Sequence, residues 1–221
     1  MNKPLCIVSC PIDTYSGYGA RARDLVKAII ELKSNEWDIK IIPQRWGDTP
    51  WGFVKDHPEW HFLEQYMLKS PLTVQPDIWC QVTVPNEFQP VGKYNIGITA
   101  GIETTICAPQ WIEGMNRMNL NIVTSNFVKT TFANVNYQKQ FENGTVQPLR
   151  VEKPMEVCFW GANTKVYKKT NEICETVKEE LDKIPETFAY LFVGQWTHGG
   201  LYSDRKDIGN LIKTFLKSFK N

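Results

Sequence analysis

Short apolar runs alternate with segments of helical periodicity along most of the chain. The first run, residues 4–9, is followed by a polar loop with glycines and then by residues 20–33, where apolar side chains recur at helical spacing. A second apolar run, residues 37–42, ends at Pro43. Because a helical crossover joins parallel strands, this strand–helix–strand order predicts two parallel strands with a right-handed connection.

The same alternation continues and sets the expected fold class. Further strands are predicted at residues 77–84, 94–99, 120–124, 155–160 and 188–193. Helices are predicted at residues 61–69, 109–118, 126–133, 170–183 and 207–219. Ser125 is a suitable N-cap for the third of these helices, and the Asn-Gly pair at 143–144 marks a hairpin or loop. We therefore expect an α/β protein with a Rossmann-like, open parallel sheet and helices on both of its faces.

Charge and cysteine content exclude several classes of protein. The 25 basic and 24 acidic residues give a net charge of +1, so no large basic surface for nucleic acid is expected. The apolar run at the N-terminus is too short for a signal peptide or a membrane span. The six cysteines form no C-x-x-C pair, and several lie in apolar runs, as reduced cysteines do. We therefore predict a cytoplasmic protein without a membrane span.

The loop between the first strand and the first helix has the sequence Ser-Gly-Tyr-Gly-Ala-Arg, residues 16–21. Glycines let a backbone approach a ligand closely, and a helix N-terminus presents free N–H groups to phosphate. Arg21 and Arg23 would add charged donors. On this hypothesis, Gly19→Val abolishes nucleotide binding while the fold stays intact. A tight turn with solvated arginines is the alternative, since the third glycine of the dinucleotide fingerprint is missing.

Four further patterns occur in a defined order along the chain. The segment GYGARARDLVKA (residues 17–28) joins a glycine loop to a helix. GIETT, PQWI and NRM follow within residues 101–118, and IVTSNFVK spans residues 122–129. LFVGQ and DRKD lie within residues 191–207. In content and order, these segments resemble the GT-B-fold glycosyltransferases of group 1, with the last pair similar to the start of their second domain.

The resemblance implies two Rossmann-like domains, of which the chain contains the first and the start of the second. Residues 1–160 would form the N-terminal domain, residues 161–185 a linker with a bridging helix, and residues 186–221 the first strand and helix of an incomplete nucleotide-sugar-binding domain. The implied activity is sugar transfer from a nucleotide-sugar donor to a hydroxyl of a carbohydrate or other acceptor. The nucleotide-sugar is a substrate. Neither a cofactor nor a metal is expected, and the sequence has no D-x-D motif. The chain alone is expected to be inactive.

The resemblance also implies two groups of residues that bind the nucleotide-sugar. The first group belongs to the glycine loop and comprises Gly17, Tyr18, Gly19 and Arg21. The second group follows the strand predicted at 188–193 and comprises Gly194, Gln195, Arg205 and Lys206. Its two basic residues would hold the donor diphosphate and stabilise the charge on the leaving group. Gln195 stands where the family usually has arginine, and residues 204–207 are alternatively a solvated helix start.

Glu103 is the candidate catalytic residue. It follows the strand predicted at 94–99, and ligands of open α/β sheets bind at the carboxyl ends of the strands. A carboxylate there would orient an acceptor hydroxyl or act as a base; alternatively, it caps the following turn. Trp46, Trp51 and Trp60 lie among glycines and prolines, and they would either stack on sugar rings or form a buried flap.

Two other classes of protein remain as alternatives. A non-catalytic nucleotide- or sugar-binding module would keep the first domain without turnover. A nicotinamide-dependent oxidoreductase would need a third glycine in the loop and an acidic residue at the end of the second strand. That strand instead continues into Pro43, Gln44 and Arg45, which disfavours the oxidoreductase.

Overall fold

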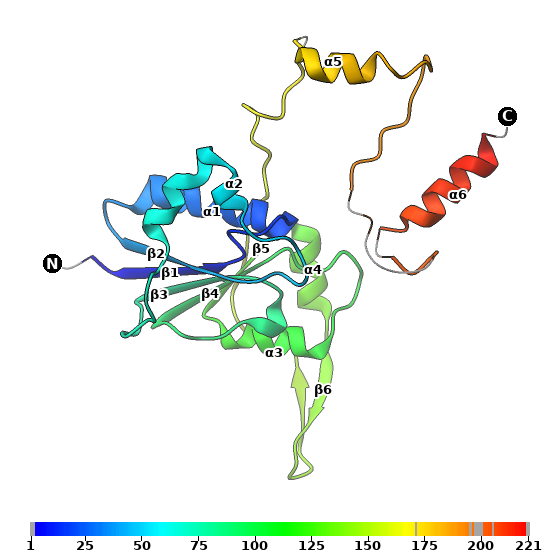
Figure 1. Ribbon diagram of the computed structural model, residues 1–221. Coiled ribbons are helices and arrows are strands. Elements are labelled where there is room, and N and C mark those ends of the chain that lie inside the picture. Colours follow the sequence, from blue (N-terminus) through cyan, green and yellow to red (C-terminus); the bar gives the residue numbers. More distant parts are fainter. Residues whose placement is uncertain (1–2, 171, 195, 197–200, 205, 220–221) are drawn as a thin grey trace. The chain divides into compact units, whose positions relative to one another are not determined.

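The computed structural model describes residues 3–170, 172–194, 196, 201–204 and 206–219 (Figure 1). The chain divides into two compact units, Met1–Ala162 and Asn163–Asn221. Almost all of the buried side chains among the described residues belong to the first unit, together with the parallel sheet.

The sheet of the first unit has six parallel strands in the order β2-β1-β3-β4-β5-β8. The strands are β1 (Leu5–Cys10), β2 (Asp38–Pro43), β3 (Ile78–Val82), β4 (Tyr94–Thr99), β5 (Leu120–Val123) and β8 (Met155–Val157). The chain builds outward from β1 to β2 on one side and from β3 onward on the other, so the strand order reverses between β1 and β3. Ligands of open α/β sheets bind at such a reversal, outside the carboxyl ends of the strands. The predicted α/β class with a Rossmann-like parallel sheet is confirmed.

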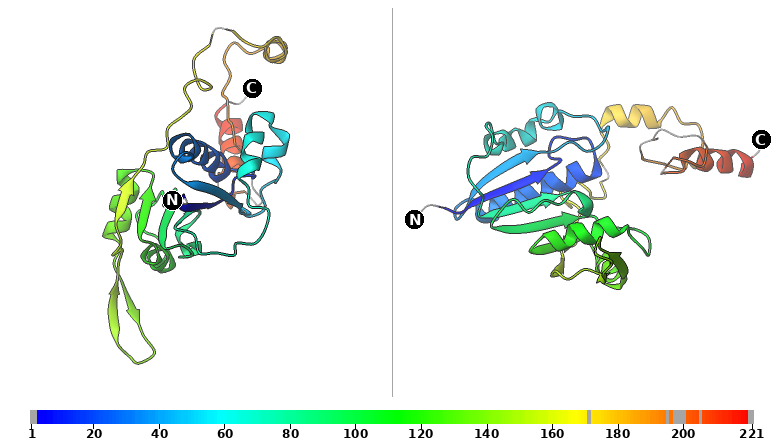
Figure 2. Two further views of the ribbon diagram at one scale, coloured as in Figure 1. Left: turned by 90° about the vertical axis from the view of Figure 1, so that its left-hand side faces the viewer. Right: turned by 90° about the horizontal axis from the view of Figure 1, so that it is seen from below.

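Helices cover both faces of this sheet, with η1 (cyan) on one side and α3 and α4 (green) on the other (Figure 2). The helices are α1 (Gly17–Lys33), α2 (Phe53–Asp56), the 3-10 helices η1 (Pro58–Tyr66) and η2 (Pro85–Glu87), α3 (Pro109–Arg117) and α4 (Asn126–Asn134). Successive side chains of a strand point to opposite faces, so β1 contributes to two cores. Val8 packs in one core with Val26 of α1. Ile7 packs in the other with Ile112 of α3 and Phe132 of α4.

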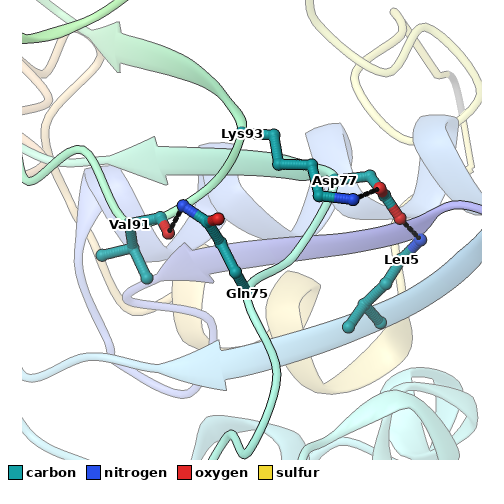
Figure 3. Close-up of polar contacts among 5 residues, drawn as sticks. All are labelled: Leu5, Gln75, Asp77, Val91 and Lys93. Atoms are coloured by element: carbon teal, nitrogen blue, oxygen red, sulfur yellow. Dashed lines mark hydrogen bonds and ion pairs between the residues drawn. The ribbon is translucent and has the colours of Figure 1, made fainter.

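Polar contacts fix the amino-terminal ends of the central strands (Figure 3). The Asp77 carboxylate, just before β3, accepts hydrogen bonds from the backbone N–H of Leu5 at 2.9 Å and from the Lys93 ammonium at 2.7 Å. The bond from Lys93, and then that from Leu5, holds the Asp77 pKa below its usual value. The side-chain amide of Gln75 donates to the Val91 carbonyl at 3.3 Å. These contacts join β1, β3 and β4 at the amino ends of the strands, whereas ligands are expected at the carboxyl ends.

A two-stranded antiparallel hairpin follows α4 and extends away from the sheet (Figure 1). It consists of β6 (Tyr137–Gln140) and β7 (Val146–Leu149). The glycine of the Asn-Gly pair at 143–144 has a φ of 81°, a conformation that favours glycine, which confirms the predicted turn. The Tyr137 hydroxyl donates to the Cys107 carbonyl at 2.6 Å and so fastens the base of the hairpin to the segment before α3.

The described part of the second unit contains α5 (Glu175–Leu181) and α6 (Ile208–Ser218). Helix α6 confirms the helix predicted at 207–219, and α5 is shorter than its prediction. The strand predicted at 188–193 is wrong: these residues have no strand structure, and Leu191 and Val193 are 88% and 85% exposed. A strand needs a neighbour to satisfy its backbone groups, and the described residues of this unit contain no other strand.

Most large apolar side chains of the second unit are exposed. On α6, the exposed set is Leu211, Ile212, Phe215 and Leu216. Tyr190 lies 5.9 Å from Phe215 and 5.7 Å from Phe219 between ring centroids, so a small aromatic group forms beside the helix. Ile208 is the only large apolar side chain buried among the described residues of this unit. The unit therefore has no core comparable with that of the first.

Candidate functional site

The glycine loop lies at the carboxyl end of β1, where the strand order reverses. Ser16 caps α1, because its Oγ accepts a hydrogen bond from the Gly19 N–H at 2.9 Å. The backbone N–H groups of Gly17 and Tyr18 have no acceptor among the described residues. They are the first two groups of a seventeen-residue helix, and such groups carry the positive end of its dipole. Gly17 and Tyr18 therefore present two N–H groups without a described acceptor at the start of α1.

The two glycines of this loop have different surroundings. A Cβ atom at Gly17 would meet no atom within 4 Å. A Cβ atom at Gly19 would lie 2.3 Å from the Thr14 carbonyl oxygen and 2.9 Å from that of Pro11. The close approach that requires glycine at 19 is therefore an approach to the protein's own backbone.

The buried side chain of Arg23 donates hydrogen bonds to the backbone of the glycine loop. Its side chain is 3% exposed, and Nη1 donates to the carbonyls of Ile12 at 2.9 Å and Thr14 at 3.0 Å. The guanidinium lies 3.4 Å from the ring centroid of Phe53. Desolvation lowers the pKa of Arg23 to about 10, so the group remains charged at neutral pH. The hypothesis that Arg23 contacts phosphate is wrong, because its side chain is buried and Nη1 donates to two carbonyls of the loop.

Tyr18 connects the glycine loop to the carboxyl end of β4. Its hydroxyl accepts a hydrogen bond from the Ala100 N–H at 2.9 Å and lies 3.2 Å from Oγ1 of Thr99. Burial raises the pKa of Tyr18, although the contact with Thr99 opposes this. The ring stacks on Trp46 with centroids 4.0 Å apart, and it meets Trp160 edge-on at 6.0 Å. Tyr18 thus joins the loop after β1, the tryptophan-rich segment and Trp160 in the segment after β8.

A pocket of about 360 Å³ opens beside Tyr18 at the carboxyl ends of β4 and β5. It is lined by Ala100, Ile102, Glu103, Thr124, Ser125, Phe127, Val128 and Trp160. Gly101 shapes the loop that carries Glu103: its φ is 78°, and a Cβ there would lie 2.2 Å from Val128 Cγ1. Only glycine fits this position without displacing α4. The structure therefore places Glu103 in a pocket at the carboxyl ends of the strands, as its position in the sequence predicted.

Glu103 is free to contact a ligand. Its side chain is exposed, and no group of the described residues donates a hydrogen bond to its carboxylate. The turn after Glu103 is closed by Thr104, whose hydroxyl donates to the Ile106 carbonyl at 3.1 Å. The alternative hypothesis, that Glu103 caps this turn, therefore finds no support among the described contacts.

Arg21 and Trp160 form one side of the site. The Arg21 guanidinium carbon lies 5.3 Å from the ring centroid of Trp160, a cation–π contact. Nε of Arg21 is buried and has no hydrogen-bond partner among the described residues. Trp160 is not among the residues predicted from the sequence. The available signal was its position at the carboxyl end of the strand predicted at 155–160, where parallel sheets place ligand contacts.

The tryptophan-rich segment folds against the glycine loop. Asp13 of the loop accepts a hydrogen bond at Oδ1 from the Val54 N–H at 2.7 Å, and Thr14 forms a β-bridge with Trp51. Trp60 packs against the core, and Trp51 is 38% exposed with Arg45 over its ring. Of the two roles predicted for these tryptophans, packing in a buried flap therefore fits Trp60. Trp46 instead lies beside the glycine loop, because its ring stacks on Tyr18.

The second predicted group of binding residues belongs to the second unit. Gly194 and the Lys206 side chain are exposed, whereas Gln195 and Arg205 lie outside the described residues. Asp204 is buried and accepts hydrogen bonds at Oδ1 from the backbone N–H groups of Lys206 at 3.1 Å and Ile208 at 3.3 Å. This carboxylate stabilises the start of α6, as expected for a helix start.

No family model, curated protein or solved structure matches this chain. The resemblance to glycosyltransferases therefore rests on the sequence segments alone. Over the described ranges, no helix combines the length and hydropathy needed to cross a membrane. Within the same ranges, no three His, Cys, Asp or Glu side chains gather closely enough to hold a metal ion.

Proposed function

We propose that this chain provides the acceptor-side part of a GT-B-type glycosyltransferase, which transfers a sugar from a nucleotide-sugar to an acceptor hydroxyl. The observation that carries the proposal is the contact between two loops: Tyr18, from the glycine loop, bonds to the end of β4 next to the pocket that holds Glu103. This contact brings two kinds of group together at the carboxyl ends of the strands. The free N–H groups of Gly17 and Tyr18 suit a phosphate, and the carboxylate of Glu103 suits a hydroxyl. The four resembling sequence segments support the same assignment.

In the proposed reaction, the acceptor oxygen forms a bond to the anomeric carbon as the bond to the diphosphate breaks. Glu103 orients the acceptor hydroxyl or accepts its proton, because its carboxylate has no partner within the described protein. The N–H groups of Gly17 and Tyr18, with Arg21 beside them, stabilise negative charge on the leaving diphosphate. The resemblance gives Arg205 and Lys206 the role of holding the donor diphosphate. The nucleotide-sugar is consumed as a substrate.

A non-catalytic nucleotide- or sugar-binding module is the second candidate. It is favoured by the second unit, whose described residues contain no strand and bury little apolar surface. Release of free sugar from a nucleotide-sugar by this chain would count against the module, because a binding module has no turnover. The proposed cytoplasmic location is supported by the cysteines, all six of which are free.

Titration of nucleotide-sugars into the chain is expected to give dissociation constants of 1 mM or weaker, and no measurable transfer. The resemblance places most donor contacts in the second domain, and each charged hydrogen bond that is missing costs about 1.5–3 kcal/mol. Two or three such losses weaken binding by several orders of magnitude, since about 1.4 kcal/mol is tenfold. Calorimetry with UDP-, GDP- and ADP-sugars measures this directly. Micromolar binding would show that the first unit carries a complete donor site.

A further inference from the structure

The walls of the Glu103 pocket combine aromatic faces with hydrogen-bonding groups. Trp160 and Phe127 line the pocket, and Phe127 is 53% exposed. Ser125 Oγ accepts from the Val128 N–H at 3.2 Å, so its own proton remains available to a ligand. Thr124 donates its proton to the Ala100 carbonyl at 3.1 Å, so its oxygen remains an acceptor. The pocket thus offers a donor, acceptors and apolar surface side by side.

We propose that this pocket binds a neutral pyranose ring of the acceptor, with Trp160 as its stacking surface; the inference rests on the glycosyltransferase function proposed above. A pyranose presents C–H groups on a ring face and hydroxyls at its rim, which matches an aromatic wall beside a carboxylate and two hydroxyls. A volume of about 360 Å³ lies at the small end of ligand pockets and suits one sugar ring. Glu103 accepts hydrogen bonds from ring hydroxyls, as unpaired carboxylates do.

Trp160 is held in place before a ligand arrives. Arg21 lies over its ring, and Tyr18 meets it edge-on. Both partners belong to α1, which is anchored in the core of the first unit. A stacking surface that is already fixed loses little conformational entropy on binding.

The carboxylate of Glu103 disfavours an acidic group placed beside it. Among the described residues, Glu103 is the only charged side chain that lines the pocket, and Arg21 lies over the ring of Trp160 outside this lining. A uronic acid would place a second carboxylate near Glu103, and like charges at short range repel. A neutral glycoside and the matching glucuronide therefore form a pair of probes that differ in one group.

The test titrates methyl β-D-gluco-, galacto- and mannopyranosides into the full chain. Saturation-transfer NMR measures their binding. At least one neutral glycoside is expected to bind with a dissociation constant in the millimolar range, and methyl β-D-glucuronide more weakly. Trp160→Ala is expected to weaken binding by about fivefold to tenfold, the loss of one stacking contact, whereas Trp160→Phe retains most of it. Tyr94→Ala is the control, because Tyr94 is an exposed aromatic at the amino end of β4.

Two results would overturn the inference: no binding of any pyranoside, or equal affinity in wild type and Trp160→Ala. Should Trp160→Ala unfold the chain, the wild-type protein still decides the matter. The indole N–H signal of Trp160, assigned by its loss in Trp160→Phe, must shift during the titration, and an unchanged signal contradicts the inference. Transfer to an acceptor that is not a carbohydrate would refute this inference alone and leave the proposed glycosyltransferase intact.

Discussion

Glu103→Gln is expected to lower the turnover of glycosyl transfer by about 10²–10⁴-fold, the usual contribution of a positioned acid or base, and to leave donor affinity unchanged. The substitution keeps the shape of the side chain and removes its charge, and no described contact within the fold depends on that charge. The measurement compares kcat and the donor dissociation constant in the protein joined to a complete nucleotide-sugar-binding domain.

Glu142→Gln is the matched control for this effect. Glu142 is also exposed, lies in the turn of the hairpin and does not line the pocket, so its amide variant should retain full turnover. A Glu103→Gln variant with normal turnover and a lower melting temperature would instead support a structural role for Glu103 in its loop.

Gly19→Ala is expected to destabilise the first unit by about 1–3 kcal/mol or more, the range for overpacking a site that cannot expand. The new methyl group would overlap two backbone oxygens, those of Thr14 and Pro11. Arg23 donates a hydrogen bond to the first, and the N–H and hydroxyl of Thr14 donate to the second, so neither oxygen moves freely. The sequence alone predicted that Gly19→Val would affect ligand binding and spare the fold. The contacts at Gly19 contradict the expectation that the fold is spared, and the effect on ligand binding stays a prediction.

Gly17→Ala is the control for Gly19→Ala. A methyl group at Gly17 meets open space, so the free energy of unfolding should change by no more than about 0.5 kcal/mol. Urea unfolding of both variants measures the difference. Equal stability of the two would show that the loop relaxes around a side chain at 19, and that glycine there serves another purpose.

The periodicity of apolar residues predicted most strands and helices of the first unit, because each element buries its apolar side chains with its own characteristic spacing. Strand β1 is buried on both faces, so a continuous apolar run marked it clearly. The Asn-Gly pair predicted the hairpin because its glycine adopts a positive φ. The strand predicted at 188–193 failed because strand formation depends on a neighbour, which a local pattern does not report.

The candidate site was predictable in outline but not in detail. Glu103 and Tyr18 were proposed as site residues because both follow the carboxyl ends of predicted strands, where α/β proteins bind ligands. Arg23 was misassigned, although it lies on the same helical stripe as Val26 and Ile30 and is buried with them. Trp160 was missed because it is the last residue of the strand predicted at 155–160, where a tryptophan is equally compatible with a core position; the strand in fact ends at Val157.

Sugar transfer is the measurement that tests the central claim most directly. Residues 1–221, joined to a complete nucleotide-sugar-binding domain, are incubated with radiolabelled UDP-, GDP- and ADP-sugars and with the pyranoside that binds most tightly. We expect a labelled glycoside with at least one donor, and product formation that is lost when Glu103 is replaced by glutamine. The absence of labelled product with every donor, from a folded protein that binds both nucleotide-sugar and pyranoside, would contradict the assignment as a glycosyltransferase.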